Sequence, residues 1–169
     1  MNRVLARWNN APGDTAEAQI LPCCGSKRWA HEIVARRPFK HEAALMAASD
    51  ETWRNLNEAD WIEAFSSHPR IGETKKQGGT HSSDAWSRQE QAKVTEAGNA
   101  VKIALAEGNR AYEKKFGRIF IVCATGKSAP EIFEMLQCRL RNDAAAELHE
   151  AAEQQRQITQ LRLKKWLQG

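Results

Sequence analysis

The 169-residue chain lacks any apolar run near the ~20 residues that a helix needs to cross a bilayer. No apolar stretch with a small-residue cleavage site follows Arg3 and Arg7, so no secretory signal is evident. Internal repeats and low-complexity boundaries are absent as well. A chain of this length can bury about two thirds of the surface that it exposes when unfolded. We therefore expect one soluble, cytoplasmic domain over residues 1–169.

Paired cysteine motifs are also missing. Cys23, Cys24, Cys123 and Cys138 form neither a C-x-x-C pair nor the spacing of a zinc finger. A redox role is the alternative, but we expect all four to be reduced and to pack as small apolar side chains.

Motifs for metals and phosphates are equally absent. His68 and His81 are separated by a Gly- and Lys-rich stretch, and no H-E-x-x-H pattern occurs. Residues 78–80 (Gly-Gly-Thr) lack the Gly-Lys-Ser/Thr ending of a P-loop. The sequence thus predicts neither a metal site nor a nucleotide-phosphate loop.

The charge is modest, at +4 with a pI of about 9.0. A basic nucleic-acid binder would explain the pI and the six tryptophans, and it predicts salt-sensitive binding. However, the basic residues are interleaved with acids, as in residues 110–115, and Trp53 and Trp61 have core-like spacing. A helical interaction module without catalysis is a second alternative, and it predicts that no turnover depends on His68.

Helical patterns and caps cover most of the chain and predict an all-α fold. One exception is the β-branched apolar run 119–124, which has no partner strand and is expected to be extended or irregular. The other is the polar stretch 70–82, expected to be a mobile surface loop long enough to cover a site. The expected helices are 14–24, 26–37, 41–56, 57–68, 87–107, a short helix around Tyr112, 128–141 and 142–167.

His68 is the first candidate for chemistry, because histidine titrates near neutral pH and can act as acid or base. A single histidine is more often structural. Here it falls at the end of a predicted helix, whose dipole favours the imidazolium form. Pro69 fixes the turn that follows, and a polar loop comes next.

Ser87 and Glu90 form the pattern of a helix-opening capping box. In the alternative, Glu90 points into a cleft and binds a hydroxyl or ring N–H. The two interpretations are compatible for Ser87, because free N–H groups at a helix start also bind anions.

Arg162 falls on an apolar stripe of the last helix together with Leu148, Ala151, Gln155 and Ile158. A buried guanidinium needs a carboxylate or an anionic ligand. The open interpretations are a structural ion pair, a side chain that reaches water, and a clamp for a substrate carboxylate.

Taken together, the motifs resemble the 2-oxo-4-hydroxy-4-carboxy-5-ureidoimidazoline (OHCU) decarboxylase family of uric acid degradation, nearly end to end. No single motif is decisive, but the ordered set is specific. It comprises residues 23–26 (Cys-Cys-Gly-Ser), 65–72 (Phe-Ser-Ser-His-Pro-Arg-Ile-Gly), 86–91 (Trp-Ser-Arg-Gln-Glu-Gln), 112–117 (Tyr-Glu-Lys-Lys-Phe-Gly), 119–126, 139–142 (Arg-Leu-Arg-Asn) and 158–163 (Ile-Thr-Gln-Leu-Arg-Leu).

The resemblance implies an all-α homodimeric lyase of purine metabolism that forms (S)-allantoin without metal or organic cofactor. It implies that His68 and Glu90 are catalytic. The substrate contacts that it implies are Pro69, Ser87, Gln91, Arg162 and the segment containing Ile121, Val122 and Ala124. Eukaryotic members often end in a peroxisomal Ser-Lys-Leu-like signal. This chain ends in Leu-Gln-Gly, so a cytoplasmic enzyme is expected.

Overall fold

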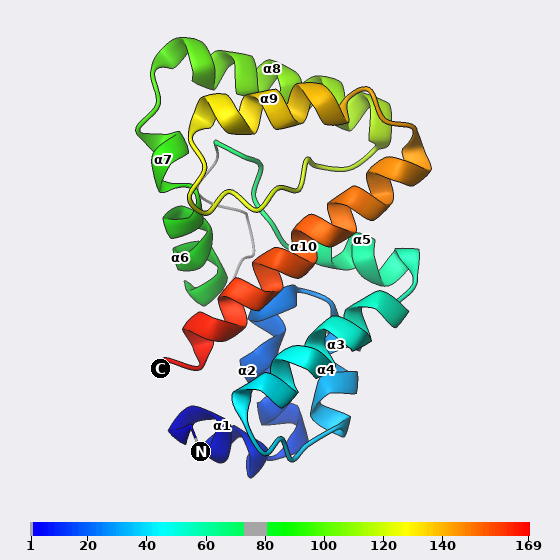
Figure 1. The fold of residues 1–169 in the computed structure, drawn as a ribbon, viewed down its shortest axis with the longest axis vertical. Coiled ribbons are helices and arrows are strands. Elements are labelled where there is room, and N and C mark those ends of the chain that lie inside the picture. The colour runs from blue at the N-terminus through cyan, green and yellow to red at the C-terminus, as the bar shows by residue number, and fades with distance from the viewer. Residues whose placement is uncertain (1, 73–80) are drawn as a thin grey trace. The chain divides into compact units, whose positions relative to one another are not determined.

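The computed structural model describes residues 2–72 and 81–169, most of which are helical, with no strand among them. The predicted all-α fold is confirmed. Figure 1 shows the order of the helices along the chain. They are α1 (Arg3–Asn9), α2 (Gly13–Cys24), α3 (Lys27–Ala35), α4 (Glu42–Asn55), α5 (Glu58–Ser66), α6 (His81–Glu90), α7 (Ala92–Thr95), α8 (Asn99–Phe116), α9 (Ala129–Arg139) and α10 (Ala144–Trp166).

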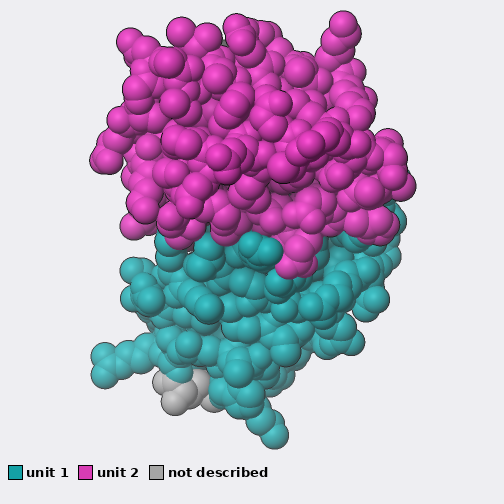
Figure 2. Space-filling model, turned by 45° about the horizontal axis from the view of Figure 1, so that its top comes forward, with its two compact units in different colours: residues 1–64, 156–169 teal, residues 65–155 magenta. Residues whose placement is uncertain are grey.

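The chain forms two compact units, which Figure 2 colours separately. The first unit comprises residues 1–64 and 156–169, and the second comprises residues 65–155. Helices α5 and α10 contribute residues to both units. The sequence gives no composition shift at either boundary, which is why only one domain is expected from it.

In the first unit, short polar caps set the helix ends. The Ser26 side chain accepts from the Trp29 N–H at the start of α3, and Gly25 ends α2 with a φ of 89°. Asn57 and Asp60 accept from each other's backbone N–H at the start of α5. These three boundaries agree with the sequence predictions.

The core of the first unit is aromatic. Trp8 lies against Phe39 and Trp166, with ring centroids 6.1 and 5.6 Å apart, and its indole N–H donates to the Ala16 carbonyl at 2.9 Å. Trp29 and Trp53 are buried as well. The tryptophans therefore contribute to packing here, as the core-like spacing predicts.

In the second unit, α8 and α9 run side by side (Figure 1) and enclose a core that includes Leu105, Tyr112 and Leu136. The two helices pack closely at Gly108, where a Cβ would lie 2.5 Å from the side-chain atom Leu136 Cδ2. This close packing explains why Gly108 lies inside α8 and does not end it, contrary to the prediction. The expected short helix around Tyr112 is the second half of α8.

The predicted helix start at Ser87 is wrong. Ser87 lies inside α6, which begins at residue 81, and its carbonyl accepts from the Gln91 N–H at 3.1 Å. The expected long helix 87–107 is instead divided near Gln91 and again at Gly98, whose extended backbone (ψ 157°) precedes α8. Glu90 is consequently the last residue of α6.

Three smaller predictions also need correction. Helix α1, which follows the cap Asn2, was not expected from the sequence. Helix α10 is capped by Asp143, one residue later than predicted. Cys138 is exposed, whereas Cys23, Cys24 and Cys123 are buried, and all four are free thiols.

The loop expected over residues 70–82 mostly lies outside the described residues, since 73–80 are not described. Its start is packed into the second unit at Ile71, and residues 81 and 82 already belong to α6. Within the described ranges, no helix is both long and apolar enough to span a membrane. The same ranges contain no cluster of three metal-ligating side chains.

Candidate active site

His68 lies two residues beyond the end of α5, in agreement with the prediction, and its backbone N–H donates to the Phe65 carbonyl at 3.2 Å. His68 as a whole is 9% exposed. Its Nε2 lies 2.7 Å from Oε1 of Gln155, a fully buried residue of α10. A carbonyl oxygen can only accept, so this contact places a proton on Nε2. Gln155 thereby fixes both the orientation and the tautomer of the ring.

The backbone after His68 is held by the side chain of Gln91, which lies between α6 and α7, and by two side chains of α8. Gln91 Oε1 accepts from the Gly72 N–H at 2.9 Å, and Asn109 Nδ2 donates to the Ile71 carbonyl at 3.0 Å. Arg70 donates to both carboxylate oxygens of Glu113, at 2.6 and 3.0 Å. The loop that carries His68 is therefore anchored on both sides. Gln91, a predicted substrate contact, is buried and makes one of these anchors.

The segment 119–124 is irregular, as predicted, and residues 120–124 are buried. Gln154 Oε1 accepts from the Cys123 N–H at 2.9 Å, and Lys127 donates to the Cys123 carbonyl at 2.7 Å. Gln154 and Gln155 are neighbours on α10, so one turn of this helix holds both the 119–124 segment and His68. Val122 and Ala124 also share a hydrophobic core with Ile71.

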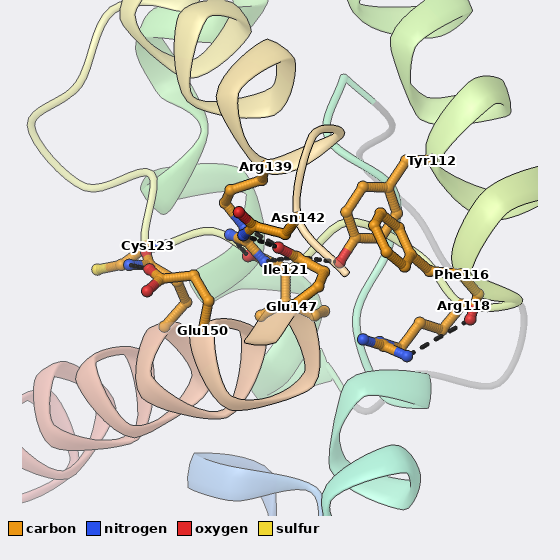
Figure 3. A network of polar contacts seen from close by, with 10 residues as sticks. Tyr112, Phe116, Arg118, Ile121, Cys123, Arg139, Asn142, Glu147 and Glu150 are labelled. Atoms are coloured by element: carbon orange, nitrogen blue, oxygen red, sulfur yellow. Dashed lines mark hydrogen bonds and ion pairs between the residues drawn. The ribbon is translucent and has the colours of Figure 1, made fainter. Parts of the chain in front are cut away.

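A buried ionic network fixes the start of this segment (Figure 3). The Glu147 carboxylate is fully buried and accepts from Tyr112, from Arg139 at 2.5 Å and from Asn142 at 2.9 Å. Arg139 in turn donates to the Ile121 carbonyl at 2.5 Å and lies over the Phe120 ring, 4.5 Å from its centroid. Burial and the hydrogen bond to Glu147 raise the pKa of Tyr112 well above its ordinary value, so the phenol stays protonated and donates.

The remaining predicted residues of the second unit lie close to these anchors along the chain. Ser87 is buried within α6, and Glu90 is half-buried at its end, directly before Gln91. Pro69 separates His68 from the anchored Arg70. The described contacts thus gather His68, Gln91 and the 119–124 segment around α10 and α8.

The similarity to known proteins extends over almost the whole chain. The sequence profile described as OHCU decarboxylase matches residues 9–164. The chain belongs to the OHCU decarboxylase family. The family membership predicted from the motifs is confirmed. The carboxy-lyase class of this family is confirmed with it.

Two relatives of the family are similar over most of this chain. It is 38% identical to the uric acid degradation bifunctional protein TTL of Arabidopsis thaliana over 90% of this chain and 47% of that protein. It is 31% identical to the OHCU decarboxylase of Amia calva over 78% of this chain and 75% of that protein. The chain therefore spans about half of the plant protein and three quarters of the fish protein.

Two solved structures share the fold. A crystal structure of OHCU decarboxylase in the presence of (S)-allantoin aligns with a TM-score of 0.75 and 32% identity, covering 88% of this chain and 96% of that chain. A crystal structure of (S)-allantoin synthase aligns with a TM-score of 0.71 over 96% of this chain and 53% of that chain. The second is only 16% identical, so it supports the fold alone.

Arg162 belongs to the first unit and is 1% exposed, so the prediction that it lies on a buried face of the last helix is confirmed. Its Nη1 donates to the Pro22 carbonyl at 3.3 Å. Burial raises the pKa of the neighbouring Cys24 thiol to about 12, an effect that Ser26, Thr159 and Arg162 partly offset. Burial raises the pKa of Cys23 too. These two thiols therefore stay neutral beside the guanidinium.

Sequence reasoning missed the side chains that hold the predicted residues in place. Gln155 was visible as a polar residue on a buried stripe, and this was the available signal for its contact with His68. Gln154, Asn109 and Glu147 gave no such signal, because isolated polar residues on amphipathic helices are usually solvated.

Proposed function

We propose that this chain catalyses the cofactor-free decarboxylation of OHCU to (S)-allantoin in urate, and thus purine, catabolism. The observation that carries the proposal is the family match over residues 9–164, which includes the loop that presents the buried His68. The substrate is an anionic imidazoline with a carboxylate and a hydroxyl on the reacting carbon. When the bond to the carboxylate breaks, the adjacent ring C=N can accept the electron pair. The protein needs to supply orientation and a proton.

His68 is proposed as the proton source. Protonated, the imidazole stabilises the charge that develops on the ring and then protonates the carbon from one face, which gives a single allantoin enantiomer. Gln155 is a positioning residue in this scheme: its carbonyl accepts from Nε2–H at 2.7 Å and favours the protonated ring. This contact supports the role of His68, because it sets the imidazole in one orientation before substrate binds.

The other residues are proposed to bind the substrate. Glu90 accepts from a hydroxyl or ring N–H, and Arg162 binds a carboxylate. Ser87 lies inside α6, so it contributes its hydroxyl and not helix-start N–H groups. Pro69, Gln91 and the backbone of Ile121, Val122 and Ala124 complete the contacts that the family resemblance implies.

The direct test generates OHCU from urate with the upstream enzymes and follows absorbance and circular dichroism after this protein is added. The wild-type chain should accelerate the reaction and give optically active allantoin. His68→Ala should lose at least ~100-fold in rate and remain folded, since general acid catalysis contributes about 10²–10⁴-fold. His31→Ala, at an exposed histidine, is the matched control. Racemic allantoin at the spontaneous rate with wild-type protein would refute the function.

Glu90 and Arg162 are tested by substitutions that remove charge and preserve size. Glu90→Gln should lower turnover without lowering the melting temperature. Arg162→Met should raise KM, and an unchanged KM would assign the buried guanidinium to structure alone. Gln155→Leu should shift the pH profile of turnover, because the ring loses the acceptor that favours its protonated form.

The proposal extends to the oligomeric state of the protein and to its location in the cell. We expect a homodimer in the cytoplasm, where free thiols stay reduced, and the four cysteines are free here. Light scattering coupled to size-exclusion chromatography should give twice the 19.0 kDa chain mass. A monomer peak at micromolar concentration would contradict the dimer.

A further inference from the structure

A tight turn follows the buried segment 119–124. The Lys127 N–H donates to the Ala124 carbonyl at 3.0 Å, and Gly126 between them has a φ of 82°. This is the pattern of a type II β-turn, in which a glycine takes the left-handed position. The turn reverses the chain, so the half-buried side chain of Lys127 reaches back along the segment. Its Nζ donates to the Cys123 carbonyl at 2.7 Å.

Three side chains hold polar backbone groups of this segment. Lys127 holds the Cys123 carbonyl, and Gln154 accepts from the Cys123 N–H at 2.9 Å. Arg139 donates to the Ile121 carbonyl at 2.5 Å (Figure 3). A buried segment without a partner strand needs such contacts, because its backbone groups are removed from water. The side chains thus replace the hydrogen bonds that a neighbouring strand would make.

Each contact also orients a second backbone group, because the C=O and the N–H of one trans peptide unit point in opposite directions. The Cys123 carbonyl shares its unit with the Ala124 N–H, which therefore points away from Lys127. In the same way, the Val122 N–H points away from Arg139. Neither N–H group is used by a hydrogen bond among the described residues. Val122 and Ala124 are both substrate contacts in the proposed function.

The donors that hold the two carbonyls are positively charged. A hydrogen bond from an ammonium to a peptide carbonyl polarises the peptide unit and makes its N–H a stronger donor. At the unit that joins Cys123 to Ala124, Lys127 has this effect on the Ala124 N–H. Loss of CO2 from the substrate places negative charge on the ring. A strengthened N–H stabilises that charge more than it stabilises the bound substrate, so it accelerates the chemical step.

We propose that Lys127 is a positioning residue for the decarboxylation. It fixes and polarises the unit that joins Cys123 to Ala124, so that the Ala124 N–H donates to the substrate ring as negative charge develops there. Lys127 acts through the peptide unit and does not touch the substrate. The inference rests on the proposed function. It predicts an effect mainly on kcat, since the charge appears only when the bond to the carboxylate breaks.

Kinetics with OHCU test the inference, after the spontaneous rate is subtracted. Lys127→Met keeps the length of the side chain and removes its charge and its donor. Its kcat should fall about tenfold or more with KM within about twofold, because a hydrogen bond to a charged group contributes a factor of that size. Lys127→Arg retains a cationic donor and should recover most of the loss.

Lys93→Met is the matched control. The exposed Lys93 donates to the Gly126 carbonyl at 3.1 Å, in the same turn, but this carbonyl lies outside the segment 119–124. The hydrogen bond from the Ser128 N–H lowers the pKa of Glu131 most, and both lysines add to that effect. Any consequence through this carboxylate is therefore common to the two variants. Lys93→Met should keep the wild-type kcat.

Nuclear magnetic resonance tests the contact without turnover. The carbonyl carbon of Cys123 and the amide of Ala124 should shift in Lys127→Met and stay in place in Lys93→Met, because only the first variant loses the hydrogen bond to this peptide unit.

Unmoved resonances in Lys127→Met would overturn the inference. A wild-type kcat in Lys127→Met, a loss confined to KM, an equal loss in Lys93→Met, or a Lys127→Arg variant no faster than Lys127→Met would do the same. If the wild-type chain gives no acceleration, the proposed function fails and the inference fails with it. Each of the other outcomes, measured beside an active wild type, overturns the inference alone.

Discussion

The buried network around Glu147 allows a stability prediction that is specific to this fold. Glu147→Gln keeps the shape of the side chain and removes its charge. Arg139, which is 5% exposed, is then left as a buried cation without its counterion. Removing one partner of a buried ion pair costs about 3–5 kcal/mol, because the remaining charge keeps its desolvation penalty. We expect Glu147→Gln to lower the free energy of unfolding by that amount.

Two further variants separate the contribution of the Tyr112 hydrogen bond from that of the Arg139–Glu147 ion pair. Tyr112→Phe removes one hydrogen bond to a charged acceptor and keeps the ring that contacts Phe116 and Phe120, so it should cost about 1.5–3 kcal/mol. The double variant Arg139→Met with Glu147→Leu removes both charges. It should cost less than the sum of the two single changes, because neither charge is left unpaired.

Urea unfolding followed by far-ultraviolet circular dichroism measures these differences, provided that intrinsic fluorescence gives the same midpoint. The matched control is Arg28→Met, which removes an exposed ion pair with Glu32 and should leave the free energy of unfolding almost unchanged, because solvent screens the pair. A Glu147→Gln cost no larger than that of Arg28→Met would refute the argument. The argument would also be refuted if the double variant cost as much as the sum of Arg139→Met and Glu147→Leu measured singly.

The remaining predictions concern packing and the thiols. Gly108→Ala should cost about 1–3 kcal/mol, because its Cβ meets the buried Leu136, whereas Gly13→Ala, in open space, should stay within about 0.5 kcal/mol; equal costs would contradict the close helix contact. A thiol reagent should label Cys138 quickly in the native chain and the three buried cysteines only after unfolding. Unfolding measured at rising pH tests Cys24, because its folded pKa of about 12 exceeds the unfolded value of about 8.5. Between these pH values only the unfolded chain loses the thiol proton, so the free energy of unfolding falls by up to about 1.4 kcal/mol per pH unit. Cys24→Ala should make this fall smaller.

Local signals in the sequence predicted most of the fold. The helix start predicted at Ser128 is a clear case. There the structure has a capping box: the Ser128 N–H donates to Glu131 at 2.7 Å, the Glu131 N–H donates to the Ser128 hydroxyl, and the first of these hydrogen bonds lowers the pKa of Glu131. Such caps involve neighbours in sequence, so their chemistry is legible without a structure. The irregular segment 119–124 was predicted from a lack of partner strands, which is also a property of the sequence.

The failures arose where a local pattern did not decide the boundary of a helix. Ser87 and Glu90 match a capping box as well as Ser128 and Glu131 do, but α6 extends through both. Gly108 matches a helix stop, but it lies inside α8, where a Cβ would meet the Leu136 side chain of α9. At Gly108 a tertiary contact overrides a local preference, and periodicity alone cannot reveal such a contact.

For His68, the sequence predicted the position of the residue but not its hydrogen-bond partner. Its position at a helix end was predicted, yet a histidine at a helix end is not by itself catalytic. Gln155 lies 87 residues away along the chain, on a stripe recognised only as buried. The hydrogen bond between Gln155 and His68 accounts for both residues, because a fully buried amide needs a hydrogen-bond partner and the imidazole needs a fixed tautomer. The pH profile of Gln155→Leu therefore tests whether this contact acts on the protonation of His68 or only on packing.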